Sequence, residues 1–197
     1  MTKRDRIRRQ MIYQLKITLK GSKPPIWRRV QTPASTTLEM VHEIIQQSMG
    51  WFNYHLHEFH VKNMAIGDPE QLCGWEMGEE PDVIDEAEIT LAELKLREGA
   101  KFEYVYDFGD NWQHEILLEK KLERERGTHY PVCIKAVKSG PPEDVGGIWG
   151  YYNMLEALDD PDHPEHETFS EWLSGEGWDS EAVDLDEINN RLSMLNV

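Results

Sequence analysis

The sequence predicts an α+β fold: a β-grasp-like mixed sheet with an aromatic β-hairpin and helices at its C-terminal end. Three observations support this prediction. Period-two strand patterns recur between residues 12 and 137, a long amphipathic helix pattern near residues 36–50 and a short one at 91–96 interrupt them, and the remaining helical patterns begin at residue 149. Strands first and helices last is the order of an α+β chain, because an α/β chain alternates the two.

The opening of the chain predicts two strands, a helix and a third strand. Residues 12–19 alternate apolar and polar side chains, and residues 26–31 form a second strand after a Lys-Pro-Pro turn. A helix should begin at Thr36, since a glutamate three residues later completes a capping box, and should end at Gly50. Its buried stripe contains Leu38, Val41, Ile45, Gln46 and Met49. The third strand covers residues 55–61, and this order is typical of a β-grasp-like opening.

The middle of the chain is less regular. Residues 64–90 are acidic and rich in glycine and proline, so we predict a long surface excursion rather than a second domain. Thr90 is then expected to cap a short helix over residues 91–96, which Gly99 would end.

An aromatic hairpin follows, and its register can be chosen from the pattern. A three-residue loop, Gly109-Asp110-Asn111, pairs Phe108 with Trp112 and Tyr106 with His114, whereas a two-residue loop pairs Phe108 with Asn111 and separates the apolar faces. We therefore predict the three-residue loop, with Asn111 in the left-handed conformation. The merged buried face should contain Phe102, Tyr104, Tyr106, Trp112, Ile116 and Leu118.

The last third of the chain predicts one strand and three helices. The strand covers residues 130–137, and the helices cover residues 149–158, 165–173 and 186–195. The first of these helices has Tyr152, Leu155 and Leu158 on one side. We expect one domain over residues 11–197, since 197 residues suit a single core.

The charge of the chain is uneven. Residues 1–10 carry five basic side chains against Asp5, a net +4, so with an overall net charge of -16 the rest carries -20. We interpret residues 1–10 as a basic flexible arm. The acidic body makes nucleic acid an unlikely partner, except through this arm.

The expected location and cofactors are predicted from motifs that the sequence lacks. No apolar run approaches the ~20 residues of a membrane span, and no apolar segment follows the basic arm, so we expect no membrane partner and no signal peptide. Cys73 and Cys133 lie far apart and form no ligand spacing, which favours reduced thiols in a cytoplasmic protein. No cofactor motif is present, because Gly146-Gly147 lacks the Lys and Ser/Thr of a phosphate loop.

Two segments, 106–114 and 140–147, concentrate glycine, acidic and aromatic residues. Their carboxylates could work as a general acid and base. The alternative is structural, since Asp at a hairpin end and Glu-Asp after Pro-Pro accept backbone N–H groups in turns. The candidate catalytic residues are Asp107, Asp110, Glu143 and Asp144.

Three histidines are candidate metal ligands. His55 and His57 lie two apart on a predicted strand and would leave the same face, and His114 lies on the hairpin. Three imidazoles can hold zinc with an open fourth position. Buried histidines bonded to a carbonyl or a hydroxyl are more common, so no metal is expected.

Five side chains are candidate binding residues. Trp27 and Arg29 share one strand face and Arg28 the other, which favours either a cation–aromatic stack covering the sheet or an exposed anchor for an acidic partner. Trp112 and Tyr151 complete the set.

The chain also resembles the plasmid pRiA4b ORF-3-like family. The resemblance covers about residues 12–195 and rests on IWRRV (26–30), MGW (49–51), HLH (55–57), YDFGDNWQH (106–114), YPVC (130–133), PPEDVGGIWG (141–150) and DPDHP (160–164). It implies a single α+β domain of bacterial or archaeal origin, frequent placement in mobile elements, and relatives labelled transposon passenger or resolvase. It implies no established activity, so no residue role is carried over.

Two residue checks limit the resemblance. Many family members have cysteines where this chain has Gly140 and Val145, so a thiolate metal site cannot be built the same way around Cys133. No serine has two arginines within five residues, which argues against serine recombination.

The sequence therefore favours a non-enzymatic binding or accessory module of mobile elements with a protein partner. The alternative is a metal-dependent hydrolase that uses His55, His57 and His114 with Asp107 or Asp110.

Overall fold

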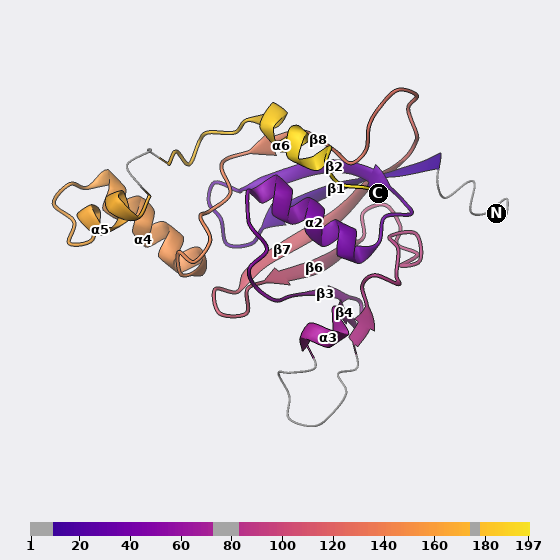
Figure 1. Cartoon of the computed structure of the whole chain (residues 1–197), viewed down its shortest axis with the longest axis horizontal. Helices are drawn as coiled ribbons and strands as arrows, with labels where there is room; N and C mark the ends of the chain where they lie inside the picture. The colour runs from indigo at the N-terminus through magenta and orange to yellow at the C-terminus, as the bar shows by residue number, and fades with distance from the viewer. Residues whose placement is uncertain (1–9, 73–82, 174–177) are drawn as a thin grey trace.

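The computed structural model describes residues 10–72, 83–173 and 178–197. Its centre is an eight-stranded sheet in the order β5-β4-β3-β6-β7-β1-β2-β8 (Figure 1), and all neighbours are antiparallel except β4 and β5. The strands are β1 (Met11–Leu19), β2 (Trp27–Pro33), β3 (His57–Val61), β4 (Met64–Gly67), β5 (Val83–Asp85), β6 (Lys101–Tyr106), β7 (Trp112–Glu123) and β8 (Val132–Val137). The chain therefore has the predicted α+β class.

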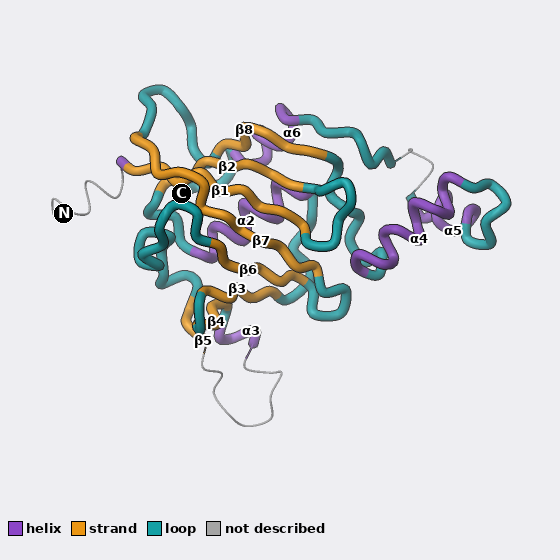
Figure 2. The backbone as a smooth tube through the Cα atoms, turned by 180° about the vertical axis from the view of Figure 1, so that it is seen from behind, coloured by secondary structure: helices purple, strands orange, loops and turns teal. Residues whose placement is uncertain are grey.

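The helices lie on one side of this sheet or beyond its edge. They are α2 (Leu38–Met49), α3 (Pro69–Leu72), α4 (Gly147–Asp159), α5 (His166–Trp172) and α6 (Leu185–Leu192). Helices α2 and α6 cover one face, and the core lies between them and the strands. Seen from behind, the sheet has no helix of the described chain in front of it (Figure 2). Of the described helices, none is long and apolar enough to cross a membrane.

Helix α2 forms where it was predicted, but its cap differs by one residue. The hydroxyl of Thr37, not Thr36, accepts from the backbone N–H of Met40, so the predicted capping box is wrong. Thr36 is unavailable because its hydroxyl bonds to the hydroxyl of Thr32. Gly50 ends the helix with φ 90° as expected. The predicted buried stripe is confirmed, since Leu38, Val41, Ile45, Gln46 and Met49 are all buried.

The prediction for residues 64–90 is wrong in part, because residues 64–67 and 83–85 extend the sheet as β4 and β5, while residues 73–82 lie outside the described residues. The expected helix over residues 91–96 is a turn instead. The N–H groups of Leu91 and Ala92 donate to carbonyls of Thr36 and Ala34, so they fasten this turn to the start of α2.

The hairpin keeps the predicted buried face but not the predicted register. Tyr106 pairs with Trp112 and Tyr104 with His114, so the register differs from the predicted one by two residues. The loop that connects the strands is therefore residues 107–111. An even shift preserves the faces, so the six predicted core side chains are all buried. Asp107 causes the shift, because it leaves the strand with φ 55° and its Oδ1 accepts from the N–H groups of Gly109 and Asp110. Asn111 is left-handed, φ 56°, as predicted.

The C-terminal helices are present, with one difference in packing. Helix α4 buries Tyr151, Met154 and Ala157, whereas the predicted side is only half-buried. Part of the reason is that the hydroxyl of Tyr152 accepts from the N–H of Lys23, which holds this ring at the boundary with solvent.

The predicted basic arm lies almost wholly outside the described residues. Gln10 alone is described, and its carbonyl accepts from the N–H of Arg124 at 2.8 Å. Gln10 is therefore bonded to the folded part of the chain. Cys73 also lies outside the described residues, while Cys133 is a buried free thiol.

Candidate functional site

Three loops meet at one end of the sheet: residues 51–55, residues 107–111 and residues 141–147. The indole N–H of Trp51 donates to the carbonyl of Pro141 at 2.8 Å, and the N–H of Gly146 donates to Oδ2 of Asp110 at 3.0 Å. The start of α4 consequently lies beside the β6–β7 connection in both views (Figures 1 and 2). The two segments that stand out in the sequence are thus neighbours in space.

Glycine makes this contact possible at two points. A Cβ atom on Gly147, which has φ 66°, would lie 2.2 Å from the carbonyl oxygen of Asp110. A Cβ atom on Gly140 would lie 2.1 Å from the carbonyl oxygen of Met49. Both approaches exclude any side chain, which accounts for glycine on each side of the Pro-Pro-Glu-Asp corner.

His55, Asp107 and Asp144 form a compact cluster where the loops meet. The Nε2 atom of His55 lies 2.9 Å from Oδ1 of Asp144 and 3.6 Å from Oδ2 of Asp107. The carboxylate of Asp107 is 12% exposed and that of Asp144 is 63% exposed. One ligand atom from each residue lies within 4.8 Å of the others, a set that could hold a divalent metal such as Mn²⁺, Fe²⁺ or Zn²⁺.

Tyr106 and Glu143 hold the loops together beside this cluster. The hydroxyl of Tyr106 donates to Oε1 of Glu143 at 2.5 Å and accepts from the N–H of Tyr54, while Oε2 of Glu143 accepts from the N–H of Phe52. Burial and the bond to Glu143 raise the pKa of Tyr106 well above its usual value. Tyr106 therefore stays protonated, and both carboxylate oxygens of Glu143 are occupied. Glu143 positions the loop at residues 51–55.

The structure does not bring the three candidate histidines together. His57 is buried, bonds to Glu86 at 2.8 Å and stacks on His42 with ring centroids 3.5 Å apart. His114 is fully buried, its Nδ1 lies 3.2 Å from the carbonyl of Trp112, and burial lowers its pKa to about 3. His55 precedes β3, which begins at His57, so strand alternation does not govern its direction. Only His55 joins the acidic candidates.

The acidic candidates divide into two roles. Asp107 and Asp144 face His55, whereas Asp110 accepts the N–H of Gly146 and Glu143 accepts from Tyr106 and Phe52. The cluster can consequently offer one imidazole and two carboxylate groups to a ligand, with a hydrogen-bonded frame behind them.

The predicted binding residues are mostly covered. Arg28, Trp112 and Tyr151 are buried. Trp27 is half-buried on the open sheet face beneath the cations of Lys16, Arg29 and Lys135. Arg29 also forms two hydrogen bonds with the carboxylate of Glu119. This arrangement is the cation–aromatic stack, one of the two predicted alternatives.

The exposed aromatic side chains lie elsewhere. Phe52 and Tyr54 are 71% and 73% exposed and stack on each other beside the cluster, with ring centroids 5.8 Å apart. Trp149, in the first turn of α4, is 84% exposed. The sequence signal was available, because Phe52 and Tyr54 follow the helix-ending Gly50 and precede the next strand, where no strand or helix period buries them.

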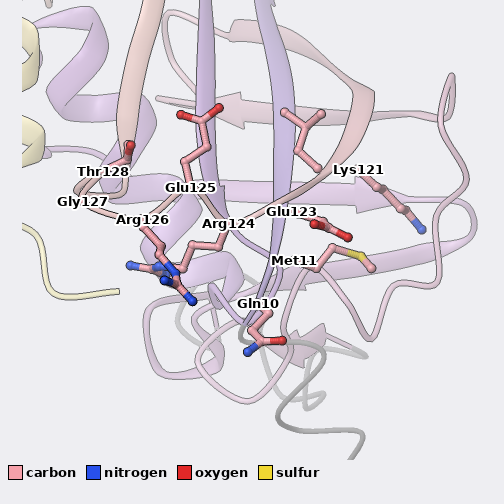
Figure 3. Close-up of a pocket in the computed structure, with 10 residues that line it drawn as sticks. Gln10, Met11, Lys121, Glu123, Arg124, Glu125, Arg126, Gly127 and Thr128 are labelled. Carbon is pink, nitrogen blue, oxygen red and sulfur yellow. The ribbon is translucent and has the colours of Figure 1, made fainter.

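A cavity of about 640 Å³ lies apart from this site. It is lined by Gln10, Met11 and the 121–128 segment (Figure 3), and contains none of the predicted site residues.

Known proteins match the chain along nearly its whole length. The profile of the family described as plasmid pRiA4b ORF-3-like protein matches residues 11–187. "Uncharacterized protein y4hQ" of Sinorhizobium fredii (strain NBRC 101917 / NGR234) is 38% identical over 185 residues, which cover 93% of this chain and 92% of that protein.

A solved structure has the same fold. The crystal structure of the protein of unknown function MM3350 from Methanosarcina mazei Go1 is 38% identical, with a TM-score of 0.79 over 90% of this chain and 97% of that one. Both the relative and the solved structure are covered almost end to end. The chain therefore belongs to the plasmid pRiA4b ORF-3-like family.

Proposed function

We propose that this protein is a non-enzymatic binding module that contacts a protein partner through the surface formed by Phe52, Tyr54, His55, Asp107 and Asp144, hereafter the loop surface. The exposed, stacked pair Phe52 and Tyr54 carries this proposal. Aromatic side chains are enriched among the residues that carry the binding energy of protein interfaces, and contiguous exposed apolar groups are a feature of interaction sites.

The loop surface is also held rigid. The backbone N–H groups of Phe52, Asn53 and Tyr54 donate to Glu143, Gln46 and Tyr106, respectively. A preorganised loop loses less conformational entropy when it binds, so a small aromatic surface can still give useful affinity.

Three further inferences, on location, biological role and fold relationship, accompany this proposal. We infer a cytoplasmic location, which the reduced Cys133 supports. We infer an accessory role in mobile elements, for which the plasmid in the family description is the support. A β-grasp relationship would rest on the order β1, β2, α2, β3 at the start of the chain.

Peptide selection tests the binding module. Random peptides displayed on phage would be selected against the intact protein and then measured against the double variant Phe52→Ala/Tyr54→Ala. We expect selected peptides to bind the double variant at least tenfold more weakly. The matched control is Met194→Ala, which removes another exposed side chain, 76% exposed, from outside the loop surface. If the selected peptides bind the double variant as tightly as they bind Met194→Ala, the loop surface is not their binding site.

A metal-dependent hydrolase is the second candidate, favoured by the cluster of His55, Asp107 and Asp144. A metal held there would supply Lewis-acid chemistry or a bound hydroxide. The His55 imidazole and the Asp107 and Asp144 carboxylates would hold it, while the turn N–H groups keep Asp107 oriented through its other oxygen.

Metal analysis separates the two candidates. The binding module predicts far less than one equivalent of zinc, iron, nickel or manganese in protein purified without chelator. The hydrolase predicts about one equivalent that His55→Gln removes, because losing one of three ligands removes much of the affinity. Stoichiometric metal together with hydrolysis of a phosphoester or amide substrate would replace the first proposal by the second.

A further inference from the structure

Arg28 is a buried cation with no carboxylate partner in the described part of the chain. Its side chain lies on β2, is 2% exposed, and reaches the end of α2. Its Nε donates to the carbonyl of Ser48 at 2.7 Å, and its Nη1 donates to the carbonyls of Trp27 and Val137. Among described residues no carboxylate oxygen lies within 4.0 Å of this guanidinium. Burial lowers the pKa of Arg28 to about 10, which reflects the cost of a desolvated charge.

Arg191 is a second guanidinium with an unused donor, and it lies nearby on α6. Its Nη1 pairs with Glu187 at 2.9 Å. Its Nε is buried, and no atom of the described chain accepts from it. The positive charge of Arg191 is close enough to lower the pKa of Arg28 further, after burial. Both features indicate that an acceptor belongs between the two side chains.

The two arginines line one cavity of about 460 Å³. Its walls come from the end of α2, the corner at residues 139–142 and the start of α6. Three carboxylates also line it, and each has another partner. Asp184 accepts the N–H of Glu187, Glu187 pairs with Arg191, and Asp179 accepts the N–H of Glu181. The buried Nε–H of Arg191 and the buried charge of Arg28 are left unmatched by these acids.

We propose that this cavity binds a small oxyanion, a phosphate or carboxylate group, between Arg28 and Arg191. The planar guanidinium presents donors in a fork that fits the oxygens of either group. The bound anion would lie against both guanidinium groups and neutralise the buried charge of Arg28. This site lies apart from the loop surface and does not depend on the proposed function.

Thermal unfolding in different salts at constant ionic strength tests the site. Sodium phosphate and sodium acetate, each at 20 mM with sodium chloride making up the balance, are compared with sodium chloride alone. We expect phosphate or acetate to raise Tm where chloride does not, because a ligand that binds only the folded state stabilises it. The salt that raises Tm identifies the chemical group that binds. If neither phosphate nor acetate raises Tm, the proposal is overturned.

Variants separate this site from general salt effects. Arg191→Gln should weaken the apparent affinity for the active anion at least tenfold, while Arg97→Gln, which removes an exposed arginine, should leave it unchanged. Tm of both variants in chloride reports whether they fold. Retained affinity in Arg191→Gln would place the anion elsewhere and reject the site.

Discussion

His55 and His57 lie two residues apart and illustrate two regions of opposite character. His57 is part of a buried polar network beneath α2, in which it stacks on His42 and bonds to Glu86. His55 lies on the loop surface and faces Asp107 and Asp144. One imidazole is satisfied by the protein itself, while the other belongs to a set of ligand atoms that can also accept an external group.

The buried region supports the exposed one. His42 bonds to the hydroxyl of Tyr104 and to the side chain of Asn53, and Gln46 accepts from the N–H of Asn53. Asn53 lies between the two exposed aromatic residues, so the network fixes the loop that presents them. The comparison teaches that the core histidines hold the site in place, whereas the chemistry of the site depends on His55.

The largest expected effect separates core from surface. Trp112→Ala should lower the free energy of unfolding by roughly 3–5 kcal/mol, because it empties a fully buried position on the hairpin face. The double variant Phe52→Ala/Tyr54→Ala should change it by no more than about 0.5 kcal/mol, as for exposed residues. Urea unfolding measures both. Similar losses in the two variants would show that the exposed pair is part of the core.

The buried network should also make stability depend on pH. Burial first, and then His57, lowers the pKa of His42 to about 3, and burial does the same for His114. Both are neutral in the folded protein but protonate near pH 6.5 when unfolded, so their contribution is intact above pH 6.5 and is lost as pH falls below it. At pH 5.5 the two together should lower the free energy of unfolding by roughly 3 kcal/mol relative to pH 7.5.

Urea unfolding at pH 7.5 and 5.5 measures this loss. His42→Gln should remove about half of the pH-dependent part, since it removes one of the two imidazoles whose pKa burial lowers. Met194→Ala, which removes an exposed side chain that does not titrate, is the control and should leave that part unchanged. An unaltered pH dependence in His42→Gln would contradict the assignment of the effect to the buried network.

The two neighbouring histidines give a direct comparison. His57→Gln should lower the free energy of unfolding by about 1–3 kcal/mol, because it removes the partner of the buried Glu86 carboxylate. It should leave any bound metal in place. His55→Gln should have a smaller effect on stability and should remove such a metal. Unfolding curves and elemental analysis of both variants check this. Loss of the metal in His57→Gln and its retention in His55→Gln would contradict these roles.

Local patterns predicted most of the fold and part of the site. Period-two alternation located the long strands, and Gly50 correctly ended α2, because these features act within a few residues. The hairpin register failed by two residues because one side chain, Asp107, captures two loop N–H groups, an interaction that the apolar pattern does not encode. Strands β4 and β5 were missed because they are short, four and three residues, which is too short for an alternating pattern to stand out.

The acidic candidates were identified correctly as residues, but their arrangement was not. The meeting of Asp107 with Asp144 depends on the contact between Gly147 and the carbonyl of Asp110, which joins segments far apart in sequence. His57 was grouped with His55 by spacing, and His114 by its place on the hairpin. Burial and hydrogen bonds separate them. His57 bonds to Glu86, which is distant in sequence, whereas His114 contacts the carbonyl of Trp112 on its own strand.

The smallest expected effect concerns the basic arm. Removal of residues 1–9 should change Tm by less than about 2 °C. A segment without apolar periodicity is expected to bury little surface. Removal of residues 1–10 should cost more, since the carbonyl of Gln10 accepts from the N–H of Arg124. Calorimetry of the two truncated proteins measures the difference. A large loss on removing residues 1–9 alone would mean that the arm packs on the domain, and that the boundary between charged flank and folded chain lies nearer the first residue.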